Sequence, residues 1–194
     1  SIRHRGPDDS GQEITEWQSD YSEERFVAAS GHRRLAILDL NPRSKRPFSS
    51  DKTTLLYNGE IYNYVELRKK YLNGKYNLLG SSDTEVLLAL IETYGLKKAI
   101  SFCYGMFAFA LYDYKNNKLF LIRDRIGEKP LYYGWAKKNF IFASEIKALK
   151  EHPQWSNNIN QLALKNFVEY NYIPTPLSIY ENIYKLEPNT ILTI

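Results

Sequence analysis

The segment Tyr57–Tyr64 places a side-chain amide directly before a glycine. Asn58 and Gly59 follow an apolar, β-favouring run over residues 53–57. The amide of Asn58 and the backbone N–H of Gly59 are two neutral donors that could converge on one point, as a site for a developing oxyanion requires. Asn-Gly is also the commonest tight-turn dipeptide. This segment alone therefore leaves two interpretations open, an oxyanion hole and a turn.

Two charged residues could complete such a site. Arg34 stands before an apolar run, where its planar guanidinium could clamp a carboxylate, although a solvated surface arginine is the commoner case. Asp83 could meet a ligand ammonium, or it could simply complement the N-terminus of a helix. Together with Asn58 and Gly59, these residues would describe a site for a free amino acid with a side-chain carbonyl. Spacing alone does not bring them together.

The elements that would position these residues are strands and helices in separate groups. Residues 1–25 are polar and turn-rich, and strands are expected at 26–30 and 53–57, with an apolar run at 35–40. A helix is expected at 61–71, and the capping-box sequence Ser82–Glu85 predicts a second one that Gly95 ends. Further expected elements are hairpins at 106–123 and 131–143, helices at 144–150 and 161–170, and a strand at 190–194. Hairpins with grouped helices indicate an α+β fold.

Composition excludes several classes of protein. The chain has 194 residues, 43% hydrophobic and 25% charged, which is ordinary for a soluble domain with a substantial core. The net charge is +4 with acidic residues scattered among the basic ones, which argues against nucleic-acid binding. No apolar run approaches the ~20 residues of a membrane span. The single cysteine, Cys103, excludes an internal disulfide and indicates a reducing cytoplasm.

No cofactor site is expected within these residues. His4, His32 and His152 lie far apart in the sequence and show no metal-ligand spacing. No P-loop and no G-x-G-x-x-G motif is present. We therefore expect neither a metal nor a nucleotide in this domain.

Seven segments in order resemble one family. They are residues 3–11, 32–39, 57–64, 82–85, 105–113, 123–133 and 142–149. Their sequences resemble the N-terminal glutaminase domain of glutamine-hydrolysing asparagine synthetases, which are class II glutamine amidotransferases. The resemblance implies an N-terminal nucleophile hydrolase fold, a four-layer αββα sandwich of two antiparallel sheets. It assigns residues 1–155 to the glutaminase domain, and residues 156–194 to its end and the lead-in to a C-terminal synthetase domain.

The resemblance also implies a role for each candidate residue. Asn58 and Gly59 match the oxyanion donors, and Arg34 matches the residue that holds the glutamine carboxylate. Asp83 and Glu60 match ligands of the glutamine α-amino end. Positions that line the same pocket, partly through backbone groups, are matched by Leu35, Ile37 and Leu38.

The family's nucleophile is a cysteine that lies well upstream of the Arg3–Gly11 motif. Its own α-amino group serves as the base. Ser1 does not match that cysteine by position, and Cys103 is internal. We therefore expect the nucleophile outside these 194 residues, and no release of glutamate by this chain alone. The alternative is a non-catalytic glutamine-binding or interface module.

Expected partners follow from the same resemblance. They are glutamine and a C-terminal synthetase domain of the same protein, which would use ATP and Mg, in the cytoplasm. The amidated acceptor and the oligomeric state, a homodimer included, stay open.

Overall fold

The computed structural model describes residues 2–18, 25–34, 48–74, 76, 78 and 80–194. The apolar run expected at 35–40 lies outside these residues. Most of the described chain forms antiparallel sheets and helices, and the α+β class is confirmed.

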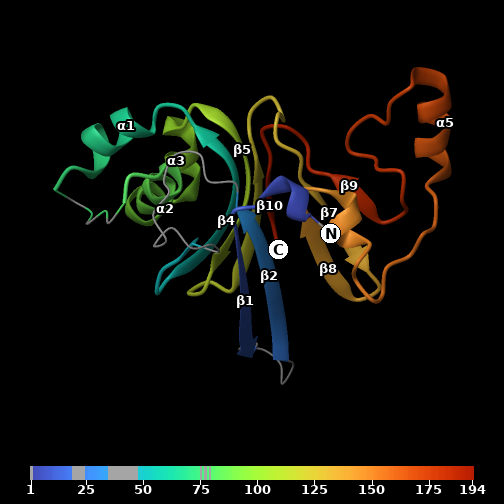
Figure 1. Ribbon diagram of the computed structural model, residues 1–194, viewed down its shortest axis with the longest axis horizontal. Helices are drawn as coiled ribbons and strands as arrows, with labels where there is room; N and C mark the ends of the chain where they lie inside the picture. The colour runs from blue at the N-terminus through green and yellow to red at the C-terminus, as the bar shows by residue number, and fades with distance from the viewer. Residues whose placement is uncertain (1, 19–24, 35–47, 75, 77, 79) are drawn as a thin grey trace.

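A five-stranded antiparallel sheet forms the centre of the molecule (Figure 1). Its two longest strands, β4 (Thr53–Ile61) and β5 (Gly105–Asp113), pair along their whole length. The outer strands are β6 (Lys118–Arg123) and β10 (Ile191–Thr193) beyond β5, and β3 (Phe48–Ser49) beside β4. The sheet order is β10-β6-β5-β4-β3.

Helices cover one face of this sheet. They are α2 (Asp83–Tyr94), α3 (Leu96–Phe102) and α1 (Tyr64–Leu67), which continues into the π-helical turn η2 (Arg68–Leu72). Tyr57, Ile61 and Phe107 point from β4 and β5 into this layer and are nearly fully buried with the leucines of α2. Burial of this apolar surface is the main stabilising contribution to the domain.

A second antiparallel sheet faces the other side. It contains β7 (Tyr132–Ala136), β8 (Asn139–Ala143) and β9 (Ile183–Lys185) in the order β8-β7-β9. Ala108, Ala110 and Leu121 of the central sheet pack there against Leu131 and Leu186. The helix α4 (Ile146–Leu149) follows β8, and α5 (Gln161–Tyr170) lies on the opposite side of the molecule from α1–α3 (Figure 1). The expected pair of facing sheets between helices is therefore confirmed.

The first described strands form a separate two-stranded ribbon. After the short turn η1 (Arg3–Arg5), β1 (Asp9–Gln18) pairs with β2 (Arg25–Arg34) over ten residues each. The interpretation of residues 1–25 as turn-rich is therefore wrong for the part that forms β1, and the strand expected at 26–30 is longer than predicted. The ribbon has no continuous apolar face to signal it. The Glu13 carboxylate joins it to the central sheet by accepting the hydroxyls of Ser49, Thr54 and Tyr114.

The predicted hairpins, the helix at 83–94 and the helix at 161–170 are confirmed. The helix expected at 61–71 begins only at Tyr64, because Ile61 still belongs to β4. Besides β1, the elements β3, α3 and β9 were not predicted. Gly95 ends α2 by donating its N–H to Ile91, as expected, but α3 begins at the next residue.

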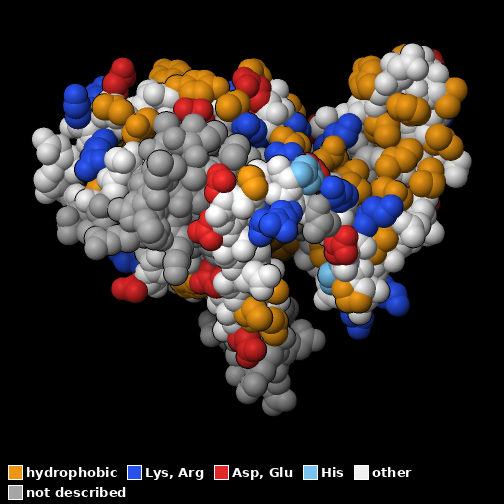
Figure 2. All heavy atoms as spheres, in the orientation of Figure 1, with side chains coloured by type: hydrophobic (Ala, Val, Ile, Leu, Met, Phe, Trp, Pro, Cys, Tyr) orange, Lys and Arg blue, Asp and Glu red, His pale blue; other side chains and the backbone are white. Residues whose placement is uncertain are grey.

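Helix α5 is held by its own caps more than by packing. The Asn160 side chain accepts the N–H of Ala163, and Asn171 ends the helix in a left-handed conformation. Ala163 is its one fully buried residue, and Figure 2 shows hydrophobic side chains on this part of the surface, where Phe167 and Val168 are 49% and 75% exposed. None of the helices in the described ranges is long and apolar enough to cross a membrane.

Candidate active site

Asn58 and Gly59 lie inside strand β4, so the turn interpretation is wrong. They pair with Ala108 and Phe107 of β5 in continuous antiparallel register. Side chains alternate along a strand, and Tyr57 points into the helical layer. Asn58 therefore points to the other side, toward the second sheet.

Two glycines let the central strands approach closely at this point. A Cβ on Gly59 would lie 2.2 Å from the carbonyl oxygen of Met106, and one on Gly105 would lie 2.1 Å from that of Glu60. Real Cβ atoms essentially never make contacts below 3.0 Å. Gly59 is thus required by packing between strands as well as being a candidate donor.

The backbone N–H of Gly59 points away from β5. The N–H of Ile61 donates to the Asp83 carboxylate (3.0 Å), at the edge of β4 that β5 does not cover. N–H groups two residues apart in a strand point to the same edge. Among the described strands, β3 pairs with this edge only at Thr54 and Leu55. The Gly59 N–H therefore lies at an edge without a described partner strand, next to the Asn58 side chain.

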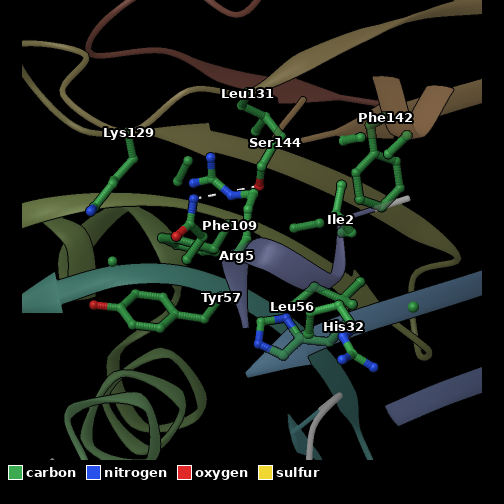
Figure 3. A pocket seen from close by; sticks show the side chains of 18 of the residues that line it. Ile2, Arg5, His32, Leu56, Tyr57, Phe109, Lys129, Leu131, Phe142 and Ser144 are labelled. Atoms are coloured by element: carbon green, nitrogen blue, oxygen red, sulfur yellow. Dashed lines mark hydrogen bonds between the residues drawn. The ribbon is translucent and has the colours of Figure 1, made fainter. Parts of the chain in front are cut away.

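A cavity of about 390 Å³ lies between the two sheets beside these donors. Asn58, Gly59 and Glu60 line it from β4. Figure 3 shows Leu56 and His32 on one side of it and Leu131, Phe142 and Ser144 on the other. The dashed line in Figure 3 is the hydrogen bond from Asn58 Nδ2 to Ser144 Oγ (3.4 Å), which crosses the cavity between strand β4 and the end of β8.

The charged side chains around the cavity suit an amino acid zwitterion. Arg5, Arg33 and Lys129 supply cationic groups, His32 supplies an imidazole, and Glu60 supplies a carboxylate. Their mixture of signs fits a ligand that carries both an α-carboxylate and an α-ammonium.

Arg34 is the last residue of β2, and the end of this strand reaches the cavity. Gly31, His32 and Arg33 line the cavity, and the backbone of Arg34 pairs with Asp9 in the next position of the ribbon. Its side chain is outside the described part, as are Leu35, Ile37 and Leu38. Their assigned roles stay predictions.

Asp83 is buried at the start of α2, on the helical side of β4. Its carboxylate accepts the hydroxyl of Tyr57 (2.8 Å) and the N–H groups of Ile61 (3.0 Å) and Thr84 (2.8 Å). The predicted N-cap is confirmed, since Ser82 accepts the N–H of Glu85, whose own carboxylate accepts the N–H of Gly80. Asp83 lies at the same edge of β4 as Gly59 but does not line the cavity. Its role as a ligand of the amino group stays a prediction.

The corner between β8 and α4 was not given a role by the sequence. Glu145 follows Ser144 there and accepts hydrogen bonds from Arg5 Nη1 (2.8 Å) and His4 Nε2 (3.1 Å). The hydrogen bond from Arg5, followed by that from His4, holds the pKa of Glu145 below its usual range. Three residues that line the cavity were not predicted as site residues: Arg5, Lys129 and Ser144. All three belong to segments that carry the family resemblance, and this resemblance is the one sequence signal that could have pointed to them.

Cys103 is not placed to act as a nucleophile. It is fully buried, does not line the cavity, and its thiol donates to the carbonyl of Ala99 (3.2 Å). Burial raises its pKa to about 12, although the Arg125 charge acts in the opposite direction. A thiol with that pKa is protonated at neutral pH, and the thiolate is the reactive form. Within the described ranges, no group of three or more metal-ligating side chains could hold a metal ion.

Two facing antiparallel sheets with helices outside them and a cavity between them are the architecture of the N-terminal nucleophile hydrolase fold. A solved structure of this type supports the fold. Glutamine phosphoribosylpyrophosphate amidotransferase from B. subtilis, complexed with ADP and GMP, superposes with a TM-score of 0.59 over 77% of this chain and 38% of its own, at 22% sequence identity.

The chain belongs to the glutamine amidotransferase family, because the family described as "Glutamine amidotransferase domain" matches residues 1–194. A Methanocaldococcus jannaschii protein, provisionally named a glutamine-hydrolysing asparagine synthetase, is 39% identical over 96% of this chain and 38% of its own length. Bacillus subtilis asparagine synthetase [glutamine-hydrolyzing] 1 is 36% identical over all of this chain and 29% of its own length. The chain thus spans about a third of the length of these relatives.

Proposed function

We propose that this domain binds glutamine in the cavity between the sheets and hydrolyses its side-chain amide, as the glutaminase part of an asparagine synthetase-like enzyme. The observation that carries this proposal is the position of Asn58 and Gly59, whose donors lie side by side at the cavity. The names of the long relatives, which describe glutamine-hydrolysing asparagine synthetases, support it.

The proposed reaction begins with attack by a cysteine thiolate on the carboxamide carbon of glutamine. We infer that this cysteine precedes the Arg3–Gly11 motif, since Cys103 is buried and protonated. The tetrahedral oxyanion accepts hydrogen bonds from Asn58 Nδ2 and Gly59 N–H. The α-amino group of the cysteine, which took up the thiol proton, passes it to the amide nitrogen, so that ammonia leaves and a thioester remains. Water then releases glutamate from the thioester. In this proposal the Arg34 guanidinium holds the α-carboxylate and the Glu60 carboxylate, which lines the cavity, holds the α-ammonium. Asp83, at the neighbouring edge of β4, would have to be reached by the α-ammonium from the cavity to act as its second ligand.

The ammonia would be consumed by a synthetase domain of the same polypeptide. That partner domain would use ATP and Mg to activate a carboxylate, and the present domain needs neither. The free, buried Cys103 supports a reducing, cytoplasmic location. The acceptor is a property of the synthetase domain.

The test is Asn58→Ala in the full-length polypeptide. Loss of one oxyanion donor typically lowers kcat by about 10²–10³. We expect such a loss in glutamine-dependent activity, while ammonia-dependent synthesis stays unchanged. Asn139→Ala is the matched control, since its amide bonds Gln154 at the exposed turn of the second sheet. Equal loss of both activities in Asn58→Ala would contradict the assigned role.

The rival function is a binding module without chemistry. Calorimetry with glutamine, run beside a glutamate-release assay on the same full-length protein, separates the two. Binding of glutamine without any release of glutamate would favour the module.

A further inference from the structure

Ser144 is the hydroxyl-bearing residue that faces Asn58 across the cavity. It stands between the end of β8 and the start of α4, 86 residues after Asn58 in the sequence. Its Oγ accepts a hydrogen bond from Asn58 Nδ2 at 3.4 Å. Catalytic hydrogen bonds are often long before a substrate is bound. An asparagine amide has two N–H donors, so this bond leaves the second N–H of Asn58 available to an oxyanion.

The position of Ser144 is itself fixed from the other side. The next residue, Glu145, accepts from Arg5 Nη1 at 2.8 Å and from His4 Nε2 at 3.1 Å. Its side chain is 26% exposed, and that of Arg5 is 29% exposed. The ion pair therefore joins η1, at the start of the described chain, to the corner that carries Ser144.

A donor stabilises a transition state best when it is already oriented before the reaction. Asn58 has two side-chain torsions, and on its cavity side the described residues offer one hydrogen-bond partner, Ser144. We propose that Ser144, held in place by the Arg5–Glu145 ion pair, is a positioning residue that orients the Asn58 amide as an oxyanion donor. This inference rests on the proposed glutaminase function.

The test is a double-mutant cycle between Ser144→Ala and Asn58→Ala in the full-length protein. A displaced catalytic group can cost up to about 10²-fold in rate, and for this single long hydrogen bond we expect about a tenfold lower kcat for glutamine with an unchanged KM. A residue that acts through Asn58 has nothing to act on once Asn58 is removed. The double variant should therefore match Asn58→Ala alone. If the two losses multiply, Ser144 contributes directly to the reaction and the positioning role is wrong.

Four further variants separate positioning from stability. Ser144→Thr keeps the hydroxyl and should recover most of the lost kcat. Ser101→Ala, which removes an exposed serine hydroxyl on α3, is the matched control. Glu145→Gln should lower kcat in the same direction as Ser144→Ala, whereas Glu151→Gln, at an exposed position just beyond α4, should not. A fall in the melting temperature that accounts for the loss of activity would overturn the proposal.

A readout without catalysis tests the contact between Ser144 and Asn58 separately from the proposed function. In ¹⁵N–¹H spectra of the same protein, the side-chain NH₂ signals of Asn58 should shift and broaden in Ser144→Ala and not in Ser101→Ala. Unchanged signals would overturn the positioning role. Absence of glutaminase activity in the wild-type protein would instead count against the proposed function.

Discussion

Replacing Gly59 with alanine should destabilise the domain far more than the same replacement at a surface glycine. The added Cβ would lie 2.2 Å from Met106 O, 2.6 Å from Phe107 Cα and 2.8 Å from Phe107 Cβ. Ordinary contact begins near 3.4 Å, so β4 and β5 would have to separate by about 1.2 Å at the centre of the sheet. All three contacts are with backbone or Cβ atoms, which cannot rotate away as the end of a long side chain can.

The cost can be estimated from two parts. Overpacking of this kind costs about 1–3 kcal/mol. Each weakened ladder hydrogen bond adds about 1 kcal/mol, and we take about two of those between β4 and β5 as weakened. We expect Gly59→Ala to lower the free energy of unfolding by about 3–5 kcal/mol, a large part of the usual 5–15 kcal/mol.

Urea unfolding followed by circular dichroism measures this difference. Gly31→Ala is the matched control, because nothing lies within 4 Å of a Cβ there although Gly31 also lies in a strand and lines the same cavity. It should change the stability by less than about 1 kcal/mol. A loss in Gly59→Ala no greater than in Gly31→Ala would refute the packing argument.

Three more outcomes follow from buried polar groups. Burial alone would raise the pKa of Asp124, but N–H groups of residues 126–129 donate to its carboxylate and hold that pKa below its usual value. Asp124→Asn should therefore lower the free energy of unfolding by about 2 kcal/mol at pH 7. This difference should shrink below about pH 4, because the wild-type carboxylate is then protonated. Urea titrations at both pH values measure it, and a pH-independent difference would refute it. Cys103 should react with a thiol reagent only after unfolding, because its side chain is buried. Absorbance assays with and without urea measure this reaction, and rapid labelling of the native protein would contradict the burial. Tyr57→Phe should lower the free energy of unfolding in urea by about 1.5 kcal/mol, because the Asp83 carboxylate loses a buried donor. The control Tyr62→Phe, at an exposed position, should leave the stability unchanged. Equal effects of the two substitutions would argue against the Asp83 contact.

The sequence predicts best those elements whose signals are local. Both predicted hairpins carry a residue with positive φ in the turn, Asn117 and Lys137, between runs of alternating or apolar residues. The helix at 83–94 has a serine cap and a glycine stop. Strand β1 has no such signal, because among the described strands it pairs only with β2, in a ribbon whose described side chains are mostly polar and partly exposed.

In the candidate site, too, residues that are neighbours in the sequence are predicted and contacts between distant segments are not. Asn58, Gly59 and Glu60 are neighbours in the sequence, and a single segment predicts that they act together. The contact of Asn58 with Ser144 spans 86 residues, and that of Arg5 with Glu145 spans 140. No periodicity or spacing rule relates residues so far apart, so only the folded chain shows that these segments meet.

The Asn-Gly pair shows why a local rule fails at a functional position. In a turn, both residues are favoured because they tolerate positive φ. In β4 each residue has a separate reason to be there: the glycine allows the approach of the Met106 carbonyl, and the asparagine directs an amide into the cavity. A strand interior holds both donors more rigidly than a turn would, because nine residues of β4 are paired with β5. Rigid donors need little reorganisation as charge develops, which is the condition for stabilising an oxyanion. The dipeptide that predicts a turn thus lies inside a strand that is paired with β5 along its whole length.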